Sequence, residues 1–372
     1  MFNHRLLRYL DWPLIVLTLG LVVYGLVFIY SATCNDGKLT GGDPYHFVKR
    51  QVLWLGVGLL VLFFFSWVDY HQLAHYTRLI YWGNLLLLML VLVVGKVSGG
   101  SQRWLGWGPF RLQPSEFAKI AVIVTLALFL AQEGERIGSL RTVLKAFLHL
   151  LVPMALIVKQ PDLGTALTFL FFWFGMLWVA EARGVHLLLM FLGGLASFAL
   201  MWHFDVLKDY QKERLLMLYN PEADPRGRGY QLIQSKVAIG SGQVWGKGLT
   251  QGTQSQLHFI PARHTDFIFS VVGEEWGLAG GAALLFLYAL LLWRGLSIVL
   301  LAQDDFGRFI ATGLVCMMAF HVFVNIGMTV GLMPVTGLPL PFFSYGGSNL
   351  LTNLTAVGLL LSIAMRRQKI KF

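Results

Sequence analysis

Apolar stretches of about 20 residues, the length that an α-helix needs to cross a bilayer, recur ten times along this chain. Only 13% of its 372 residues are charged, whereas soluble proteins carry about 25%. We therefore expect an all-α polytopic membrane protein in which residues 1–372 form a single integral membrane domain. The ten predicted helices are 12–32, 49–68, 78–96, 116–133, 143–159, 163–181, 185–203, 267–300, 307–332 and 344–365.

The distribution of basic residues predicts how these helices are oriented. Ten spans place both termini on one side, and the short loops on that side hold more Lys and Arg than the loops opposite, as cytoplasmic loops do. Residues 204–265 then form a large extracytoplasmic loop between helices seven and eight, in which 230–240 are predicted to be an amphipathic surface helix. The net charge of +10 suits anionic membrane lipids. We expect no nucleic-acid partner, because the basic residues are not interleaved with aromatic ones.

Polar residues gather at the extracytoplasmic ends of the predicted helices, above all in "PARHTDFIFSVVGEEWG", which ends at Gly277. On a helix, Asp266, Ser270, Gly273 and Glu274 share one face with Gly277, and such a stripe faces a neighbouring helix or a wet cavity. Ionisable residues inside a membrane are functional candidates. The plainer interpretation makes Asp266 a helix cap and gives Glu274 a buried basic partner, and the spacing alone does not decide between the two.

A second polar stretch is "SQRWLGWGPFRLQPSEFAKIAV". Arg103 and Arg111 fall in a loop, and Glu116 and Lys119 lie three residues apart on one helix face, where they can pair. These cations can bind phosphate. The alternative is an internal ion pair with no role in binding.

Two further stretches interrupt the apolar pattern. In "KQPDLGTAL", Asp162 follows a proline and can cap the next helix. In "NIGMTVGLMPVTGLPLPFFSYGGSNLLTN", prolines and glycines break any helix, and Ser344 can cap the last one. Non-helical backbone at membrane depth is tolerated only where it is buried in protein or lines a wet cavity. This segment is therefore either a structural re-entrant loop or a lining for substrate.

The chain resembles the SEDS family (shape, elongation, division and sporulation) of bacterial membrane proteins. The resemblance rests on "QPSEFAKIA", "KQPDLGTAL", "YQLIQSKVAIGSG", "HTDFIFSVVGEEWG" and "PVTGLPLPFFSYGGSN", in this order. It implies a peptidoglycan glycosyltransferase of the cytoplasmic (inner) membrane, with ten helices, lipid II as substrate and a class B penicillin-binding protein, a transpeptidase, as partner. Two stretches, "QRWLGWGPFRLQPSE" and "FFSYGGSNLLTN", are more similar to members that act in cell elongation than to those that act in division.

The catalytic aspartate of the family matches Asp266. Polymerisation expels a diphosphate that needs no protonation, so one carboxylate acting as general base is sufficient. The departing diphosphate needs positive charge, which basic side chains or a divalent cation such as Mg²⁺ or Mn²⁺ can supply. The expected substrate-binding residues are Glu116, Lys119, Asp162, Arg103, Arg111, Arg263 and Ser344. Two other functions stay open, namely a lipid II flippase and an inactive scaffold for the transpeptidase.

Overall fold

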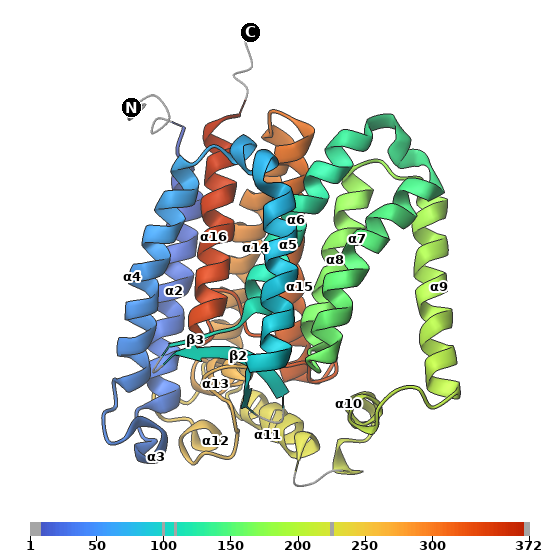
Figure 1. Cartoon of the computed structure of the whole chain (residues 1–372). Helices are drawn as coiled ribbons and strands as arrows, with labels where there is room; N and C mark the ends of the chain where they lie inside the picture. The colour runs from blue at the N-terminus through green and yellow to red at the C-terminus, as the bar shows by residue number, and fades with distance from the viewer. Residues whose placement is uncertain (1–8, 99–100, 108–109, 224–226, 368–372) are drawn as a thin grey trace.

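Long apolar helices that run between two ends of the molecule make up most of the structure (Figure 1). The computed structural model describes residues 9–98, 101–107, 110–223 and 227–367. Within these ranges, nine helices are long and apolar enough to cross a membrane, and α8 (Leu163–Val179) is apolar but shorter. The nine are α2 (Trp12–Thr33), α4 (His46–Trp67), α5 (Tyr70–Val94), α6 (Pro114–Glu133), α7 (Leu140–Lys159), α9 (Gly184–His203), α14 (Gly277–Leu301), α15 (Asp305–Val330) and α16 (Gly347–Met365).

The two ends of this bundle differ in structure. At one end, here called the terminal end, α2 begins and α16 ends (Figure 1). The other end, here called the loop end, carries short helices and a small sheet (Figure 1). These helices are α3 (Gly37–Thr40), α10 (Asp209–Tyr219), α11 (Arg228–Ser241), α12 (Thr253–Gln256) and α13 (Ile268–Glu275). Short 3₁₀ helices, η1 (Gly134–Gly138) and η2 (Pro221–Ala223), lie in the connections.

All ten predicted apolar segments are helical, and the split of 143–181 into two helices is confirmed. The prediction of one unbroken helix over 267–300 is wrong, because α13 and α14 are separated at Gly277, whose φ is +63°. The backbone groups freed by this break pair with an earlier loop: the amides of Leu278 and Ala279 donate to the carbonyls of Gln243 (2.8 Å) and Val244 (3.0 Å). A break at this depth is tolerated because protein groups satisfy its backbone.

The stretch predicted as a plain loop before α6 forms a three-stranded antiparallel sheet. Its strands are β1 (Lys96–Ser98), β2 (Ser101–Trp107) and β3 (Phe110–Leu112), in the order β1-β2-β3. Lys96 lies opposite Trp104, and Leu105 lies opposite Leu112. The sheet crosses the loop end and joins α5 to α6 (Figure 1).

The amphipathic helix expected at 230–240 is present as α11, but it packs against the bundle rather than lying free on its surface. Ser235 Oγ lies 2.6 Å from Ser270 Oγ of α13 and donates to the carbonyl of Thr329 on α15 (2.6 Å). A Cβ added at Gly273 would meet Ile239 of α11 at 3.0 Å. The small and polar stripe of α13 therefore faces a neighbouring helix, one of the two alternatives that its spacing leaves open.

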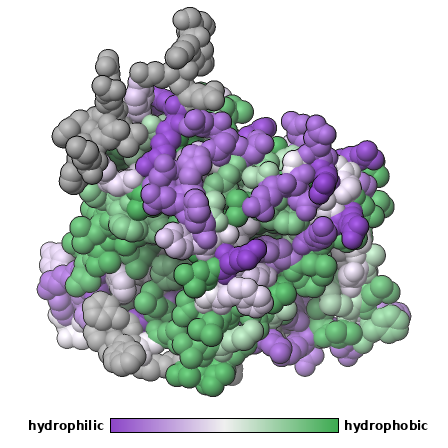
Figure 2. Space-filling model, turned by 45° about the horizontal axis from the view of Figure 1, so that its top comes forward, coloured by the Kyte–Doolittle hydropathy of each residue, from purple (hydrophilic) through white to green (hydrophobic). Residues whose placement is uncertain are grey.

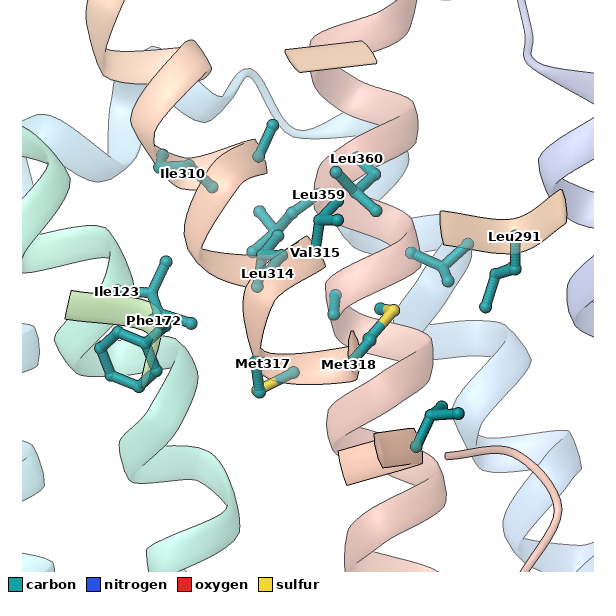
Figure 3. Close-up of a cluster of buried hydrophobic side chains, with 14 of the residues drawn as sticks. Ile123, Phe172, Leu291, Ile310, Leu314, Val315, Met317, Met318, Leu359 and Leu360 are labelled. Carbon is teal, nitrogen blue, oxygen red and sulfur yellow. The ribbon is translucent and has the colours of Figure 1, made fainter. Parts of the chain in front are cut away.

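The core of the bundle is centred on α15 and α16. Figure 3 shows Leu314, Val315, Met317 and Met318 of α15 beside Leu359 and Leu360 of α16, with side chains of α6, α8 and α14 around them. All these side chains are buried. Such close packing, together with interhelical hydrogen bonds, holds helices together in a bilayer, where lipid tails are as apolar as the helix surfaces.

Glycine permits the close approach of α16 to α4. A Cβ added at Gly358 would lie 2.7 Å from the carbonyl oxygen of Leu62 and 3.0 Å from Phe65 Cβ, whereas one added at Gly56 of α4 meets nothing within 4 Å. We expect Gly358→Ala to lower the free energy of unfolding by about 1–3 kcal/mol through overpacking. Gly56→Ala should leave it unchanged or raise it by up to about 1 kcal/mol, since alanine favours a helix. Thermal unfolding in detergent tests this difference, and equal midpoints for the two variants would contradict it.

Candidate functional site

Asp266 lies in a turn at the loop end, directly before α13 rather than on a helix. Its amide donates to the carbonyl of Ala262 (3.1 Å), and α13 begins only at Ile268. The residue at the cap position of α13 is Phe267, and no side chain bonds to the first turn. The interpretation of Asp266 as a helix cap is therefore wrong. The residue as a whole remains partly exposed.

The non-helical segment 331–346 holds this turn in place. Asn325 of α15 donates from one amide nitrogen to the carbonyls of both Asp266 (2.8 Å) and Leu338 (2.7 Å). Ser344 Oγ donates to the carbonyl of Thr265 (2.6 Å) and accepts a bond from the amide of Leu340 (2.9 Å). These hydrogen bonds hold the backbone of the turn, and none of them involves the Asp266 carboxylate.

The Asp266 carboxylate lies against Gly337. A Cβ added at Gly337 would lie 3.3 Å from Asp266 Oδ2, and Gly337 has a φ of +78°, which disfavours any other residue. Beside Gly337, Thr336 and Leu338 pack on Gly164 near the start of α8. The loop 331–346 thus brings Asp266 and the N-terminus of α8 to the same place.

Asp162 caps α8 and forms the second acidic part of the site. Its Oδ1 accepts a bond from the amide of Thr165 (3.3 Å), and its Oδ2 accepts one from Gln113 Nε2 (3.2 Å). Arg103 of β2 lies 3.7 Å from Asp162 and donates to the carbonyls of Gln160 and Pro161. The cap predicted for Asp162 is confirmed, and Arg103 fastens the sheet to the α7–α8 turn.

The surroundings of Asp266 change its acidity. Desolvation by burial raises the pKa of this carboxyl to about 6, and the charge of Asp162 adds to the rise. A hydrogen bond with Thr265 and the positive charges of Arg103 and Arg214 act in the opposite direction. A carboxylate with this pKa is ionised near neutral pH yet basic enough to accept a proton.

Glu116 and Lys119 form the predicted ion pair, but inside the bundle. Lys119 Nζ lies 2.8 Å from Glu116 Oε1 and 3.1 Å from Nε2 of His321 on α15. Glu116 and Lys119 are 3% and 0% exposed, so neither side chain is accessible beside Asp266. Both were expected to bind substrate, and the structure instead places them in a buried cluster with His321.

Three other candidates take up positions that the sequence did not predict. Arg263 is buried and is engaged by Asp36 (2.7 Å) and by the carbonyl of Ala32 (2.7 Å), so it is not available to a diphosphate. Ser344 caps no helix, since α16 begins at Gly347, and it is fully buried, so it positions the Asp266 turn rather than binding substrate. Arg111 of β3 is exposed, and its carbonyl accepts a bond from Ser348 (3.4 Å).

The paired glutamates of α13 stabilise the neighbouring loop. Glu274 accepts bonds from the amides of Gln254 (2.8 Å) and Ser255 (2.9 Å) and pairs with Lys247 (2.9 Å). Glu275 accepts a bond from Ser31 (2.6 Å). The basic partner expected for Glu274 is therefore Lys247, which is itself partly exposed, and both glutamates hold the segment that follows α11.

Sequence reasoning missed two polar residues of the site, Arg214 and Asn325. Arg214 lies on α10, in a stretch that reads as an ordinary charged loop. Asn325 lies within a long apolar run, where a buried amide is a signal for a structural or functional role. That signal was available, but its partners, the carbonyls of Asp266 and Leu338, are not evident from spacing.

We predict that the buried ion pair is sensitive to the loss of one partner. Lys119→Met leaves Glu116 buried without its cation and should lower the free energy of unfolding by about 3–5 kcal/mol. The double variant Glu116→Gln with Lys119→Met removes both charges and should recover most of this loss. Thermal unfolding in detergent gives the comparison, and a double variant as unstable as the single one would show that the pairing is not what Lys119 contributes.

Comparisons with known proteins agree with this architecture. Residues 12–369 match the model of the FtsW/RodA/SpoVE family of cell cycle proteins. The chain is 41% identical over 357 residues to stage V sporulation protein E of Bacillus subtilis, covering 95% of this chain and 96% of that protein. It is 40% identical over 366 residues to peptidoglycan glycosyltransferase MrdB of Escherichia coli K12, covering 97% and 95%.

Solved structures show the same similarity. A chain from a study of how a peptidoglycan synthase complex coordinates polymerization and crosslinking superposes with a TM-score of 0.80 at 36% identity, covering 95% of this chain and 97% of that one. The crystal structure of the rod shape determining protein RodA of Thermus thermophilus gives a TM-score of 0.70 at 33% identity, covering 97% and 98%. The chain is thus a polytopic membrane protein that belongs to the SEDS family, which comprises FtsW, RodA and SpoVE.

Proposed function

We propose that this protein is a peptidoglycan glycosyltransferase that polymerises lipid II during cell-wall elongation, with Asp266 as the general base. The observation that carries the proposal is that Asp266, a partly exposed residue whose carboxyl pKa is raised to about 6, lies in a turn that Asn325 and Ser344 hold by hydrogen bonds. The relatives named peptidoglycan glycosyltransferase, which include MrdB of Escherichia coli and RodA of Treponema pallidum, support it. The proposed role in elongation, as opposed to division, rests only on the two sequence stretches "QRWLGWGPFRLQPSE" and "FFSYGGSNLLTN".

The proposed reaction requires one base and a source of positive charge. A sugar hydroxyl of one chain attacks the anomeric carbon of another, the new C–O bond forms as the bond to the diphosphate breaks, and Asp266 takes the hydroxyl proton. The diphosphate leaves with its electron pair and needs no proton, unlike the leaving group of a glycosidase. The positive charges of Arg103 and Arg214 act on Asp266, and we propose that these two arginines stabilise the departing diphosphate. Arg111 is a third candidate for this role.

A divalent cation is a further proposed source of charge. The described residues contain no group of three or more His, Cys, Asp or Glu side chains able to hold a metal. Magnesium commonly binds through one or two carboxylates together with substrate phosphates, and Asp162 and Asp266 are the two carboxylates of the site described above. The cation would add charge to the departing diphosphate.

A flippase is a rival proposal, and the buried ionisable residues that would suit a transporter, Glu274 and Lys119, are engaged by other groups. Glu274 is engaged by Lys247 and two amides, and the Lys119 pair sits in the first two turns of α6 rather than at the middle of the bundle. A transporter is expected to bind its substrate near the midplane between discontinuous helices. A polymerisation assay distinguishes the proposed enzyme from an inactive scaffold for a transpeptidase.

The setting of the proposed activity follows from the same features. We propose that both termini are cytoplasmic, that the loop end lies outside the cytoplasmic membrane, and that a class B penicillin-binding protein is the partner. A structural neighbour comes from a complex that couples polymerization to crosslinking, which supports such a partner. Lipid II needs lateral entry from the bilayer, and we propose that it enters beside α9, in which Leu187 is the only buried residue and which is the least buried of the described spanning helices (Figure 1).

Substitution of the proposed base provides the first test. We expect Asp266→Asn to reduce lipid II polymerisation by the purified, partner-bound protein by about 10²–10⁴-fold, because the amide cannot accept the proton. Asp43→Asn is the matched control, since Asp43 is an exposed acid of the loop end that pairs with Lys49 (2.8 Å), and it should retain full activity. Normal polymerisation by Asp266→Asn would refute the assignment. Translocated lipid II without polymer in the native protein would indicate a flippase instead.

The raised pKa of Asp266 provides a second test through pH. The base must be ionised to act, so the rate should fall as the pH drops through about 6, and by roughly tenfold one unit below that pKa. The pKa of Asp266 in the folded protein exceeds its unfolded value of about 3.9. Ionisation of Asp266 therefore lowers the free energy of unfolding as the pH rises from the unfolded pKa to the folded pKa. Above the folded pKa the loss stays constant. Asp266→Asn should therefore unfold at a higher temperature than the native protein at pH 8, with no such advantage at pH 3.5. A pH profile without an acid limb near 6 would contradict the role.

A further inference from the structure

A second polar feature lies at the terminal end, far from Asp266. A cavity of about 580 Å³ opens between η1, the start of α7 and the start of α9. Its volume falls in the range of ligand sites, about 300–1,000 Å³. Figure 2, which turns this end toward the viewer, shows many hydrophilic side chains across this end of the molecule and apolar ones along its flanks. No part of the proposed glycosyltransferase mechanism uses it.

The cavity is strongly basic. Arg136, Arg141, Lys145 and Arg183 line it, together with His186. Its two acids, Glu133 and Glu135, do not balance these charges. Glu133 lies 3.7 Å from Lys145 and accepts a bond from Thr142 (3.4 Å). Among the described residues, none of the three arginines has a carboxylate within ion-pair distance. An unneutralised group of guanidinium ions in a concave site favours an anion, and guanidinium matches phosphate in geometry.

The walls of the cavity come from two separate helix connections. A Cβ added at Gly138 of η1 would lie 3.6 Å from Arg183 Nε, so the side chain of Arg183, which precedes α9, reaches back across the cavity to the α6–α7 connection. A ligand in this cavity would therefore touch both connections. Since α9 is the least buried of the spanning helices, few other contacts hold its start to the bundle.

The two helices that begin at the cavity carry exposed apolar side chains. On α7, Leu144 and Leu148 are 44% and 59% exposed, and on α9, Leu188 and Leu189 are 56% and 54% exposed. A free inorganic anion has no apolar part that could cover these leucines. A phospholipid satisfies both parts, because its phosphate is held by the arginines while its acyl chains cover the leucines.

We propose that the cavity is a binding site for the headgroup of an anionic phospholipid, whose chains lie against α7 and α9. The assigned ligand class is a phosphodiester lipid with net negative charge, such as phosphatidylglycerol or cardiolipin. Basic pockets between transmembrane helices on the cytoplasmic side bind such headgroups, and the excess of Lys and Arg predicts that this end is cytoplasmic. The bound lipid joins the α6–α7 connection to the start of α9.

The experiment measures lipid binding by native mass spectrometry on the full-length protein in detergent. Phosphatidylglycerol and phosphatidylcholine with identical chains are the probes. The double variant Arg136→Gln with Arg183→Gln should lose phosphatidylglycerol affinity by roughly fivefold for each arginine, about 25-fold in total. The matched control is Arg78→Gln with Arg308→Gln, which removes two charges at the same end outside the cavity, and it should change affinity less than twofold.

Three outcomes would overturn the proposal. The first is an equal loss of affinity in the cavity pair and the control pair, which would reduce the effect to general surface charge. The second is equal binding of phosphatidylcholine. The third is displacement of the lipid by millimolar inorganic phosphate, which would make the ligand a soluble anion. Circular dichroism and the unfolding midpoint of the lipid-free variants show that both pairs fold, so a loss confined to the cavity pair supports the lipid site.

Discussion

The need to satisfy backbone hydrogen-bonding groups away from water determines where Asp266 lies. Two non-helical segments, 261–267 and 331–346, occur near the ends of membrane helices, where unpaired backbone groups are costly. They pair with each other: the carbonyl of His264 accepts a bond from the amide of Tyr345 (3.0 Å), and Ser344 Oγ donates to the carbonyl of Thr265 (2.6 Å). These hydrogen bonds are made to the backbone of the turn, and neither of them engages the Asp266 carboxylate.

Charged residues at the loop end divide into two groups with different surroundings. Arg263 and Glu274 are buried and hydrogen-bonded to groups from distant parts of the chain, as buried charges must be to remain ionised. Asp266 and Arg103 are partly exposed, and they influence each other through charge. Full burial marks the structural residues, whereas partial exposure marks the residues that we propose act on a substrate.

The sequence predicts the helices well because a membrane imposes one long apolar pattern on each of them. It predicts poorly wherever the decisive partner is distant along the chain. The break before Gly277 depends on carbonyls at Gln243 and Val244, the burial of Arg263 depends on Asp36, and no local pattern contains those pairings. The motifs that locate Asp266 and Asp162 are local and were found. Arg214 was not, because α10 lies in a polar stretch that nothing in its spacing distinguishes from a loop.

The buried pair of Glu116 and Lys119 contributes to the site through the orientation of α15. His321, which contacts Lys119, and Asn325, which holds the carbonyls of Asp266 and Leu338, lie four residues apart and so share one face of that helix. A rotation of α15 that broke the contact with Lys119 would also turn Asn325 away from the Asp266 turn. A buried ion pair adds little net stability compared with apolar packing. Its value here is that it fixes one rotation of α15, and that rotation keeps Asn325 bonded to the backbone of the Asp266 turn.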